Sequence, residues 1–266
     1  MQHLFQSWES LSSDIRAASH TLFLSDYDGT LTPIVSRPDE AILSAEVKEK
    51  LRVLAQKPIF SVGIISGRSL SEIKTMVGIE GIYYAGNHGL EIEGPGLKFT
   101  NPAAELAQAE IKNLIKQFSA KLASTDGVIV EDKGLGLSIH YRLVRKSEVT
   151  RVIEIFHQIT SPSLREGKIK VTSGKKVLEV RPPIDWHKGK AVEAIRRELK
   201  KALKYEQLLT IYLGDDTTDE DAFRVIQRPQ GWSIFVGEDN PTSNADYFLN
   251  SPSEVTTFLC RLLEFK

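Results

Sequence analysis

Short apolar runs alternate with helical patterns in the first third of the chain. Thr21–Ser25, Phe60–Ile65 and Ile82–Ala85 are continuous apolar runs, which predict buried strands. Between the first two, Ser44–Gln56 carries apolar residues at helical spacing and predicts a helix. Strand, helix and strand in this order favour a parallel sheet with right-handed crossovers. Ligands of such sheets bind at the carboxyl ends of the strands.

The pattern changes in the middle of the chain. Helix, two strands, helix and two strands are predicted there, at Asn101–Ala123, Val128–Val130, Leu137–Arg142, Ser147–Thr160, Lys168–Thr172 and Lys176–Val180. A turn at Ser173 and Gly174 is expected to join the last two strands. This order of elements is typical of an α+β unit, which we place at 104–182.

The α/β alternation returns after Pro182 and Pro183. The elements predicted there are a helix, a strand, a helix, a strand and a last helix, at Lys188–Leu203, Leu208–Leu213, Glu220–Ile226, Ile234–Val236 and from Ser253 onward. The chain therefore predicts an α/β protein whose Rossmann-like parallel-sheet core is discontinuous, at 1–103 and 183–266. The α+β unit is an insertion into that core.

Composition narrows the class of protein. Apolar residues make up 41% of the 266 residues and charged residues 26%, values typical of globular proteins rather than disordered or fibrous ones. The net charge of −1 gives no reason to expect nucleic acid or a membrane as partner. The insertion has 14 Lys and Arg against 9 Asp and Glu, and the remainder has 20 against 26. A basic insertion over an acidic core suits an anionic substrate bound beside a cation.

The single cysteine and the lack of targeting signals indicate a reducing compartment. Cys260 excludes a disulfide within the chain, and its apolar neighbours predict that it is buried. No run approaches the roughly 18 apolar residues that a membrane span needs, and the first residues do not resemble an export signal. We expect a cytoplasmic protein, and a monomer.

Two aspartates follow the first predicted strand directly, in the string DYDGT at 26–30. Residues two apart in an extended chain point the same way, so Asp26 and Asp28 can aim at one point. Like charges this close raise the pKa of one carboxyl group unless a cation neutralises them. The alternative is an ordinary Asp-Gly turn at the end of a strand.

A second acidic string, GDDTTDED at 214–221, follows the predicted strand Leu208–Leu213. Oxygen ligands of this kind suit Mg²⁺. Asp219 and the two residues after it also suit the first turn of a helix, whereas Asp215 and Asp216 come too early for that.

Two further positions could bind an anion. Ser66 and Arg68 follow the strand Phe60–Ile65 and offer a hydroxyl group, backbone N–H groups and a cation at a predicted helix start. Lys188 begins another predicted helix. A lysine at the start of a helix is common on protein surfaces, so neither position is decisive alone.

The order of these strings resembles the haloacid dehalogenase superfamily of phosphotransferases. The resemblance implies a HAD-like core in which Asp26 is the nucleophile and Asp28 the acid and base. It also implies phosphate binding by Ser66 and Lys188, which complete the catalytic set. The implied Mg²⁺ ligands are Asp26, the backbone carbonyl of Asp28, and Asp215, with Asp216 and Asp219 in supporting positions.

Further strings resemble the trehalose-6-phosphate phosphatase family. They are GNHGLE at 86–91, VEDKGLGLSIHYR at 130–142, KKVLEVRP at 175–182 and the Lys-Gly helix start at 188–189. The resemblance covers about residues 21–245 and implies hydrolysis of trehalose 6-phosphate, with the insertion as a cap that determines substrate specificity. The implied substrate-binding residues are Arg68, Asn87, His88, Glu91, Glu131, Lys133, His140, Arg142, Lys176 and Glu179.

Some details of the resemblance stay open. His187 stands where most relatives carry Asn, so the contact at that corner is undecided. Whether Lys175 or Lys176 faces the sugar is undecided as well.

Two other functions remain as alternatives. A related HAD phosphatase for another glycosyl phosphate, such as sucrose 6-phosphate or glucosylglycerol phosphate, would share the core but not the cap strings. A non-catalytic sensor of a sugar phosphate would not need Asp26, Asp28, Lys188 and Asp215 together. In each case the expected partner is a small sugar phosphate.

Overall fold

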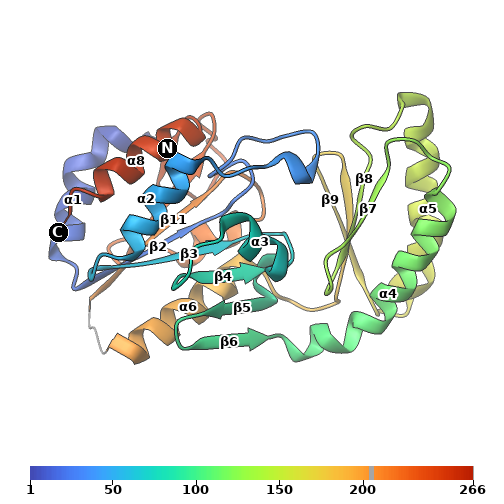
Figure 1. The fold of residues 1–266 in the computed structure, drawn as a ribbon, viewed down its shortest axis with the longest axis horizontal. Helices are drawn as coiled ribbons and strands as arrows, with labels where there is room; N and C mark the ends of the chain where they lie inside the picture. The colour runs from blue at the N-terminus through green and yellow to red at the C-terminus, as the bar shows by residue number, and fades with distance from the viewer. Residues whose placement is uncertain (204–206, 266) are drawn as a thin grey trace. The chain divides into compact units, whose positions relative to one another are not determined.

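The computed structural model describes residues 1–203 and 207–265, and the chain forms two compact units (Figure 1). The first unit comprises Met1–Phe99 and Trp186–Lys266, and the second comprises Thr100–Asp185. The predicted insertion, 104–182, begins four residues after the start of the second unit and ends three residues before its end.

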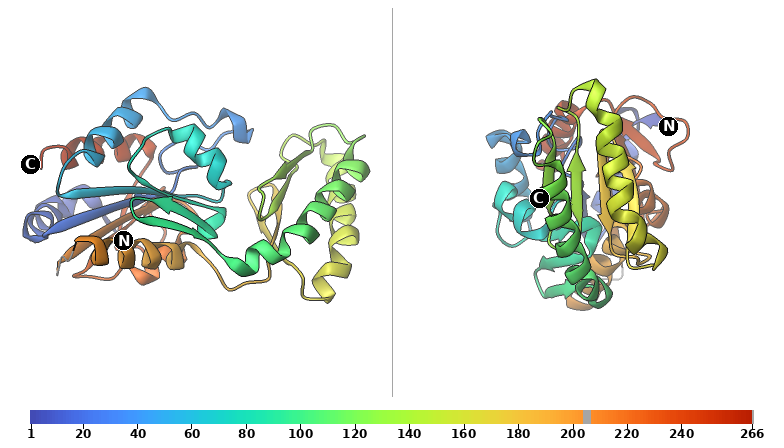
Figure 2. Two further views of the ribbon diagram at one scale, coloured as in Figure 1. Left: turned by 60° about the horizontal axis from the view of Figure 1, so that its bottom comes forward. Right: turned by 90° about the vertical axis from the view of Figure 1, so that its right-hand side faces the viewer.

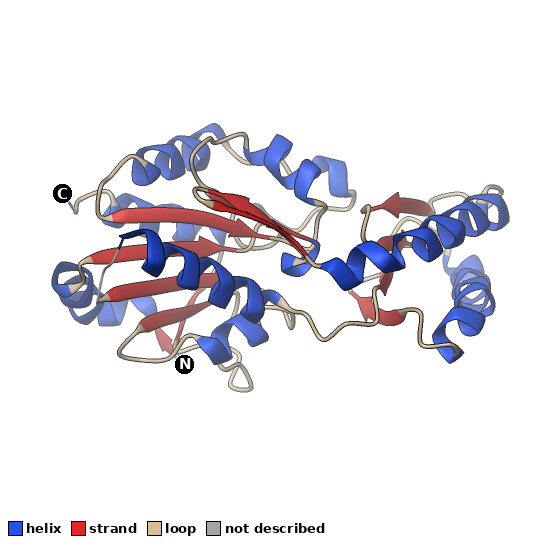
Figure 3. Cartoon of the chain, turned by 90° about the horizontal axis from the view of Figure 1, so that it is seen from below, coloured by secondary structure: helices blue, strands red, loops and turns tan. Residues whose placement is uncertain are grey.

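A nine-stranded sheet forms the centre of the first unit, in the order β1-β13-β12-β11-β2-β3-β4-β5-β6. Strands of this sheet lie side by side with helices around them (Figure 3). The strands are β1 Gln2–His3, β2 His20–Ser25, β3 Phe60–Ile65, β4 Tyr83–Gly86, β5 Glu91–Gly94, β6 Leu97–Thr100, β11 Leu208–Gly214, β12 Gly231–Val236 and β13 Tyr247–Leu249. The pairs from β1 to β4 along this order are parallel, and β5 pairs antiparallel with β4. The predicted parallel-sheet α/β class is confirmed.

Helices cover both faces of this sheet (Figure 2). On one face, α1 Trp8–Ala17, α2 Ala45–Ala55, α3 Leu70–Val77 and α8 Pro252–Leu262 share an apolar cluster with strand residues such as Phe23 and Ile64. On the other face, α6 Lys188–Leu203 and α7 Glu220–Val225 pack against residues such as Leu22 and Leu24. Because neighbouring strand residues alternate between the clusters, both faces of the strands are buried, as the continuous apolar runs predict.

The second unit is a four-stranded antiparallel sheet with two helices. Its strand order is β7-β8-β10-β9, and its elements are α4 Pro102–Leu122, β7 Ile129–Asp132, β8 Leu137–His140, α5 Lys146–Arg165, β9 Lys170–Gly174 and β10 Val177–Arg181. Ile139 and Leu178 pack with Phe118 and Phe156 of the helices. Residues of the opposite parity lie on the other face of the sheet, which is polar.

Two expectations about the chain are wrong. The turn predicted at Ser173 and Gly174 lies two residues later, because β9 continues through both residues and the chain turns at Lys175 and Lys176. Cys260 is exposed rather than buried. Its neighbours in α8 are buried in the core, and Cys260 lies on the outer side of the same helix.

Several elements have no counterpart in the sequence prediction. They are α1, the strands β5 and β6, the edge strand β1 and its neighbour β13. The helix α3 follows the helix start predicted at Ser66 and Arg68, for which no bounds were predicted. Short three-residue or four-residue 3-10 turns also occur at Leu4–Ser7, Pro38–Glu40 and Asn87–Gly89. Among residues 1–203 and 207–265, no helix has both the length and the apolar character needed to cross a membrane.

Candidate active site

Three neighbouring parallel strands bring the predicted catalytic residues to one edge of the sheet. β2 lies between β3 and β11, with Ser25 level with Ile64 on one side and with Leu213 on the other. Asp26, Ser66 and Asp215 follow the ends of these three strands. They therefore emerge at the same carboxyl edge, where ligands of open α/β sheets bind.

Lys188, the first residue of α6, joins two of the acidic strings. Its Nζ lies 2.9 Å from Oδ2 of Asp26 and 2.8 Å from Oδ1 of Asp219. The lysine side chain is 2% exposed, and that of Asp219 is fully buried. A buried ammonium group shared by two carboxylates is a strong constraint on geometry, because removing the lysine would leave both carboxylates uncompensated.

Asp219 accepts four hydrogen bonds and so organises the second acidic string. Its Oδ1 accepts from Lys188 and from the hydroxyl of Tyr212. Its Oδ2 accepts from the backbone N–H groups of Asp215 and Asp216, each at 3.1 Å. With both oxygens occupied, Asp219 supports the loop that carries Asp215 rather than presenting a free lone pair of its own.

The charges in this cluster shift one another's pKa values. Burial raises the pKa of Asp26 well above its ordinary value; Lys188 opposes this shift, and the neighbouring aspartates add to it. Burial would lower the pKa of Lys188, but Asp219 and Asp26 outweigh burial and raise it. Burial also favours a raised pKa for Asp216, but Lys188 and hydrogen bonds from Thr218 lower it. One lysine thus leaves the cluster with an excess of negative charge.

The donor set fits a hard divalent cation. One ligand oxygen each from Asp26, Asp215 and Asp219 can be chosen so that all lie within 4.8 Å of one another. Asp26 and Asp215 are the natural ligands of the three, since Asp219 already accepts four hydrogen bonds. Carboxylate oxygens beside excess negative charge are the environment that Mg²⁺ prefers.

Gly29 allows the two acidic strings to approach each other. Its φ is +83°, and a Cβ atom at this position would lie 2.2 Å from Oδ2 of Asp215. Only glycine combines this backbone conformation with so close a neighbour. Gly29 is therefore required for two reasons: the turn needs its positive φ, and Asp215, after the end of β11, leaves no room for a Cβ atom.

Arg68 forms a bidentate pair with the carboxylate of Asp28. Its Nε and Nη2 donate to the two oxygens of Asp28, each at 2.8 Å. It also bonds Glu72 and donates to the carbonyl of Pro38 at 2.7 Å. Because the guanidinium group is buried in this network, the structure places Arg68 as a partner of Asp28, and its predicted contact with substrate stays a prediction.

The segment after β3, which begins at Ser66, hydrogen-bonds to the turn after β4, which carries Asn87 and His88. Oγ of Ser66 accepts from the backbone N–H of Arg68 at 3.1 Å, and the carbonyl of Ser66 accepts from that of His88 at 2.9 Å. Asn87 donates through Nδ2 to Glu91 at 2.9 Å. Asn87 and His88 have backbone φ values of 51° and 57°, a left-handed conformation typical of functional turns in non-glycine residues.

In the second unit, four predicted residues form one charged network on the polar face of the sheet. Nε2 of His140 lies 2.6 Å from Glu131. Nζ of Lys133 donates to Oε1 of Glu179 at 2.9 Å and lies 4.0 Å from Glu131. Arg181 pairs with the other oxygen of Glu179. A face that alternates carboxylates and cations offers both acceptors and donors to a polyhydroxylated ligand.

The remaining predicted residues of this unit lie beside the turn between β9 and β10. Arg142 donates to the carbonyl of Lys175 at 3.0 Å. Lys176 has a φ of 69°, and its Nζ lies 5.9 Å from the centre of the Tyr141 ring. In the first unit, Nδ1 of His187, which stands where most relatives carry Asn, lies 4.0 Å from Oδ2 of Asp221. These contacts leave the choice between Lys175 and Lys176 open.

Sequence reasoning did not identify Tyr212, Glu72 or Arg181 as members of these networks. Glu72 lies four residues after Arg68, a spacing that puts the two on one face of a helix start. Arg181 lies two residues after Glu179, a spacing that puts the two on one face of a strand. Tyr212 is a hydroxyl-bearing residue in the otherwise mostly apolar strand β11. These positional signals were available but not specific.

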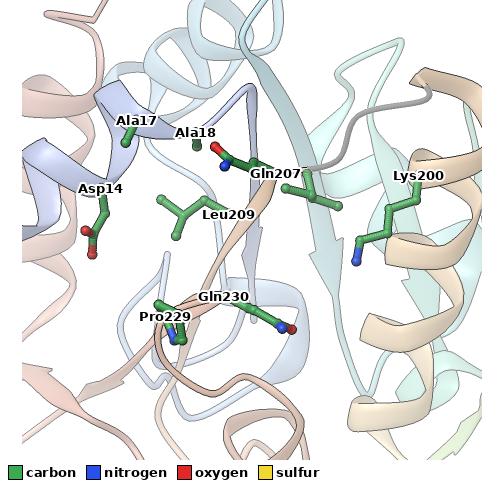
Figure 4. Close-up of a pocket in the computed structure, with 9 residues that line it drawn as sticks. Asp14, Ala17, Ala18, Lys200, Gln207, Leu209, Pro229 and Gln230 are labelled. Carbon is green, nitrogen blue, oxygen red and sulfur yellow. The ribbon is translucent and has the colours of Figure 1, made fainter.

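A separate cavity of about 350 Å³ lies near the amino end of β11 (Figure 4). Its lining includes Asp14, Lys200, Gln207, Leu209 and Gln230. Asp215 follows the opposite end of the same strand. The cavity is therefore not part of the candidate active site.

Comparisons with known proteins agree with the family resemblance that the sequence motifs indicate. The family model for trehalose-phosphatase matches residues 24–253. A probable trehalose-phosphate phosphatase 4 of Oryza sativa subsp. japonica is 38% identical over 97% of this chain and 70% of its own length. Trehalose-phosphate phosphatase B of Arabidopsis thaliana is 38% identical over 91% of this chain and 66% of its own length.

Solved structures show the same fold. The C-terminal domain of trehalose-6-phosphate phosphatase from C. albicans has a TM-score of 0.78 at 27% identity, and each chain is covered to 97%. A haloacid dehalogenase-like hydrolase from Bacteroides thetaiotaomicron has a TM-score of 0.62 at 16% identity, over 91% of this chain and 99% of the other. The second likeness concerns the fold alone.

Proposed function

Since the chain belongs to the trehalose-phosphatase family, we propose that it hydrolyses trehalose 6-phosphate to trehalose and phosphate through an aspartyl-phosphate on Asp26. The observation that best supports this chemistry is the buried Lys188, which lies within 3 Å of both Asp26 and Asp219. A fixed cation at the nucleophile is what the approach of a phosphate dianion to a carboxylate requires.

The reaction needs two successive displacements at phosphorus. In the first, a carboxylate oxygen of Asp26 bonds to phosphorus while the bond from phosphorus to the sugar oxygen breaks. In the second, water bonds to the same phosphorus and the bond to Asp26 breaks, which releases phosphate. Lys188 and the backbone N–H groups around Ser66 stabilise negative charge on the transferring group in both steps.

Asp28 is the residue that moves protons in this proposal. It gives a proton to the departing sugar alkoxide and then takes one from the attacking water. Both its oxygens accept from Arg68 in the structure. Arg68 therefore fixes the orientation of Asp28, and each of the two carboxylate oxygens keeps a second lone pair that can face the leaving group.

Mg²⁺ is the cofactor proposed for the site. Asp26, Asp215 and the backbone carbonyl of Asp28 would hold it, and it would supply charge neutralisation for the nucleophile and the phosphate. The raised pKa of Asp26 supports this assignment, because Lys188 alone does not offset the burial of that carboxyl group.

The second unit is proposed as the cap that selects the disaccharide. Glu131, Lys133, His140 and Glu179 lie on one polar sheet face and offer acceptors and donors for sugar hydroxyl groups. A site that pairs with specific hydroxyl groups discriminates strongly against a ligand that lacks them.

The test is phosphate release from trehalose 6-phosphate, sucrose 6-phosphate, glucosylglycerol phosphate and glucose 6-phosphate, with Mg²⁺ and with EDTA. We expect release from trehalose 6-phosphate at the highest kcat/KM, abolished by EDTA. Preference for another sugar would keep the aspartyl chemistry and overturn the substrate. Absence of release from every substrate would favour a sensor of sugar phosphates instead.

A further inference from the structure

Tyr212 is a buried polar residue at the active site that the mechanism above does not use. It lies on β11, and its side chain is fully buried. Its hydroxyl donates to Oδ1 of Asp219 at 2.5 Å. The same oxygen accepts from Nζ of Lys188 at 2.8 Å, so tyrosine and lysine share one acceptor.

The shared acceptor matters because two buried carboxylates compete for one ammonium group. Lys188 has three N–H donors, of which one reaches Asp219 and one reaches Asp26. The third is left for a phosphate oxygen. A neutral donor on Asp219 stabilises that carboxylate without adding charge, and so weakens its pull on Lys188. The backbone N–H groups on Oδ2 act in the same sense.

We propose that Tyr212 is a positioning residue for phosphoryl transfer, whose hydroxyl satisfies Asp219 so that Lys188 stays between the nucleophile and the substrate phosphate. The inference rests on the proposed function, which assigns Lys188 to the phosphate. A packing role is the alternative, since the ring lies edge-on to Phe223 with the centroids 5.8 Å apart. Phenylalanine would keep that contact and remove only the hydroxyl.

The kinetic test compares Tyr212→Phe with wild type and with Tyr84→Phe. Tyr84 is also buried, and its hydroxyl donates to the carbonyl of Ile79 at 2.7 Å, outside the site. For Tyr212→Phe we expect kcat to fall about tenfold, the effect of losing one hydrogen bond to a charged group, with KM changed less than about threefold. Tyr84→Phe should lower Tm about as much as Tyr212→Phe does, and it should leave kcat unchanged. Each protein is assayed on trehalose 6-phosphate and on p-nitrophenyl phosphate.

A crystal structure of Tyr212→Phe gives a readout that does not depend on activity. We expect Nζ of Lys188 to stay on Asp219 and to move beyond hydrogen-bond distance of Asp26. Wild-type kcat in this variant, or a lysine that keeps both contacts, would overturn the inference. Loss of the proposed function is a different result: a wild type inactive on sugar phosphates leaves the aryl phosphate rates and the lysine position to decide the role of Tyr212.

Discussion

At the residue scale, the proposed nucleophile Asp26 lies at a buried position where its charge destabilises the fold. Burial raises the pKa of Asp26, so the folded protein disfavours the ionised form that the proposed reaction needs. Asp219 is buried beside the same lysine and its pKa is raised for the same first reason. Active sites often contain charges that destabilise the folded state, and here the effect on stability can be measured by changing Asp26 alone.

Asp26→Asn is expected to abolish turnover while raising thermal stability. The amide cannot attack phosphorus at a useful rate, so kcat should fall at least about 100-fold. In the unfolded chain Asp26 ionises near the ordinary aspartate pKa of 3.8, and in the fold its pKa is raised. Stability is therefore lost from wild type as pH rises through that interval, and the uncharged variant is spared this loss.

The measurement is thermal unfolding of both proteins in EDTA across the pH range. The Tm advantage of Asp26→Asn should be small near pH 4 and should grow as pH rises toward the raised pKa of Asp26. An advantage that is constant over this range would show that the charge of Asp26 does not destabilise the fold. More than a tenth of wild-type activity in the variant would contradict its role as nucleophile.

Sequence reasoning at this scale succeeded where a residue follows a strand. Asp26, Ser66 and Asp215 could be placed because parallel strand ends share one edge of the sheet. The structure brings them together, and their roles in catalysis stay predictions. The contacts of Tyr212 and the pairing of Arg68 with Asp28 could not be predicted, because they depend on side-chain directions across different elements.

At the element scale, the tight turn after β2 requires glycine at position 29 for two separable reasons. Gly29 needs a positive φ, and it also has Oδ2 of Asp215 where a Cβ would stand. Gly81 has a φ of +76° with no atom within 4 Å of such a Cβ. Alanine at either position strains the backbone by about 1 kcal/mol, but only at Gly29 does it also collide with a site residue.

Gly29→Ala should therefore lower kcat/KM at least about tenfold, because it displaces a proposed Mg²⁺ ligand. Gly81→Ala should lose a few degrees of Tm and keep wild-type kinetics. Steady-state assays at several Mg²⁺ concentrations distinguish the two, since the first variant should need more Mg²⁺ for half-maximal activity. Equal kinetic effects of the two variants would mean that the approach of Asp215 is unimportant.

The polar face of the second unit's sheet gives another prediction at this scale. Glu179 orients both Lys133 and Arg181, so Glu179→Gln should weaken their presentation to the sugar. We expect KM for trehalose 6-phosphate to rise about tenfold and the rate on p-nitrophenyl phosphate to change less than about twofold. Glu166→Gln, at an exposed pair with Lys168, is the control and should change neither. Equal losses on both substrates in Glu179→Gln would contradict a role in sugar binding.

At the scale of the whole molecule, much of the fold was predictable because its strongest signals are long and apolar. Phe60–Ile65 and Lys188–Leu203 have the predicted bounds, since both have clear apolar patterns and clear ends. The strands β5 and β6 were not predicted because they mix charged and apolar residues at the sheet edge. The side chain of Ser69 accepts from the backbone N–H of Glu72 at the start of α3, so that helix begins just after Arg68, where a helix start was predicted without bounds.

The excess negative charge at the site predicts that the stability of the whole chain depends on Mg²⁺. A cation that binds only the folded state raises its stability by mass action, by about 2.7 kcal/mol at 100 times the dissociation constant. For a chain of this size that is a Tm increase on the order of 5 °C. Asp215→Asn should remove most of this increase, because it removes a proposed ligand. Asp239→Asn, whose carboxylate pairs with the terminal amine, should retain it.

Differential scanning calorimetry with EDTA, Mg²⁺ and Na⁺ of matched ionic strength separates binding from general screening. Screening acts on all the exposed charges, so Na⁺ should give at most a small shift in every variant. A Mg²⁺ effect that Na⁺ reproduces, or that survives in Asp215→Asn, would place the cation away from the acidic cluster. A Mg²⁺-specific increase lost with Asp215 would connect the chain's stability to the same carboxylates that are proposed to neutralise the nucleophile and the phosphate.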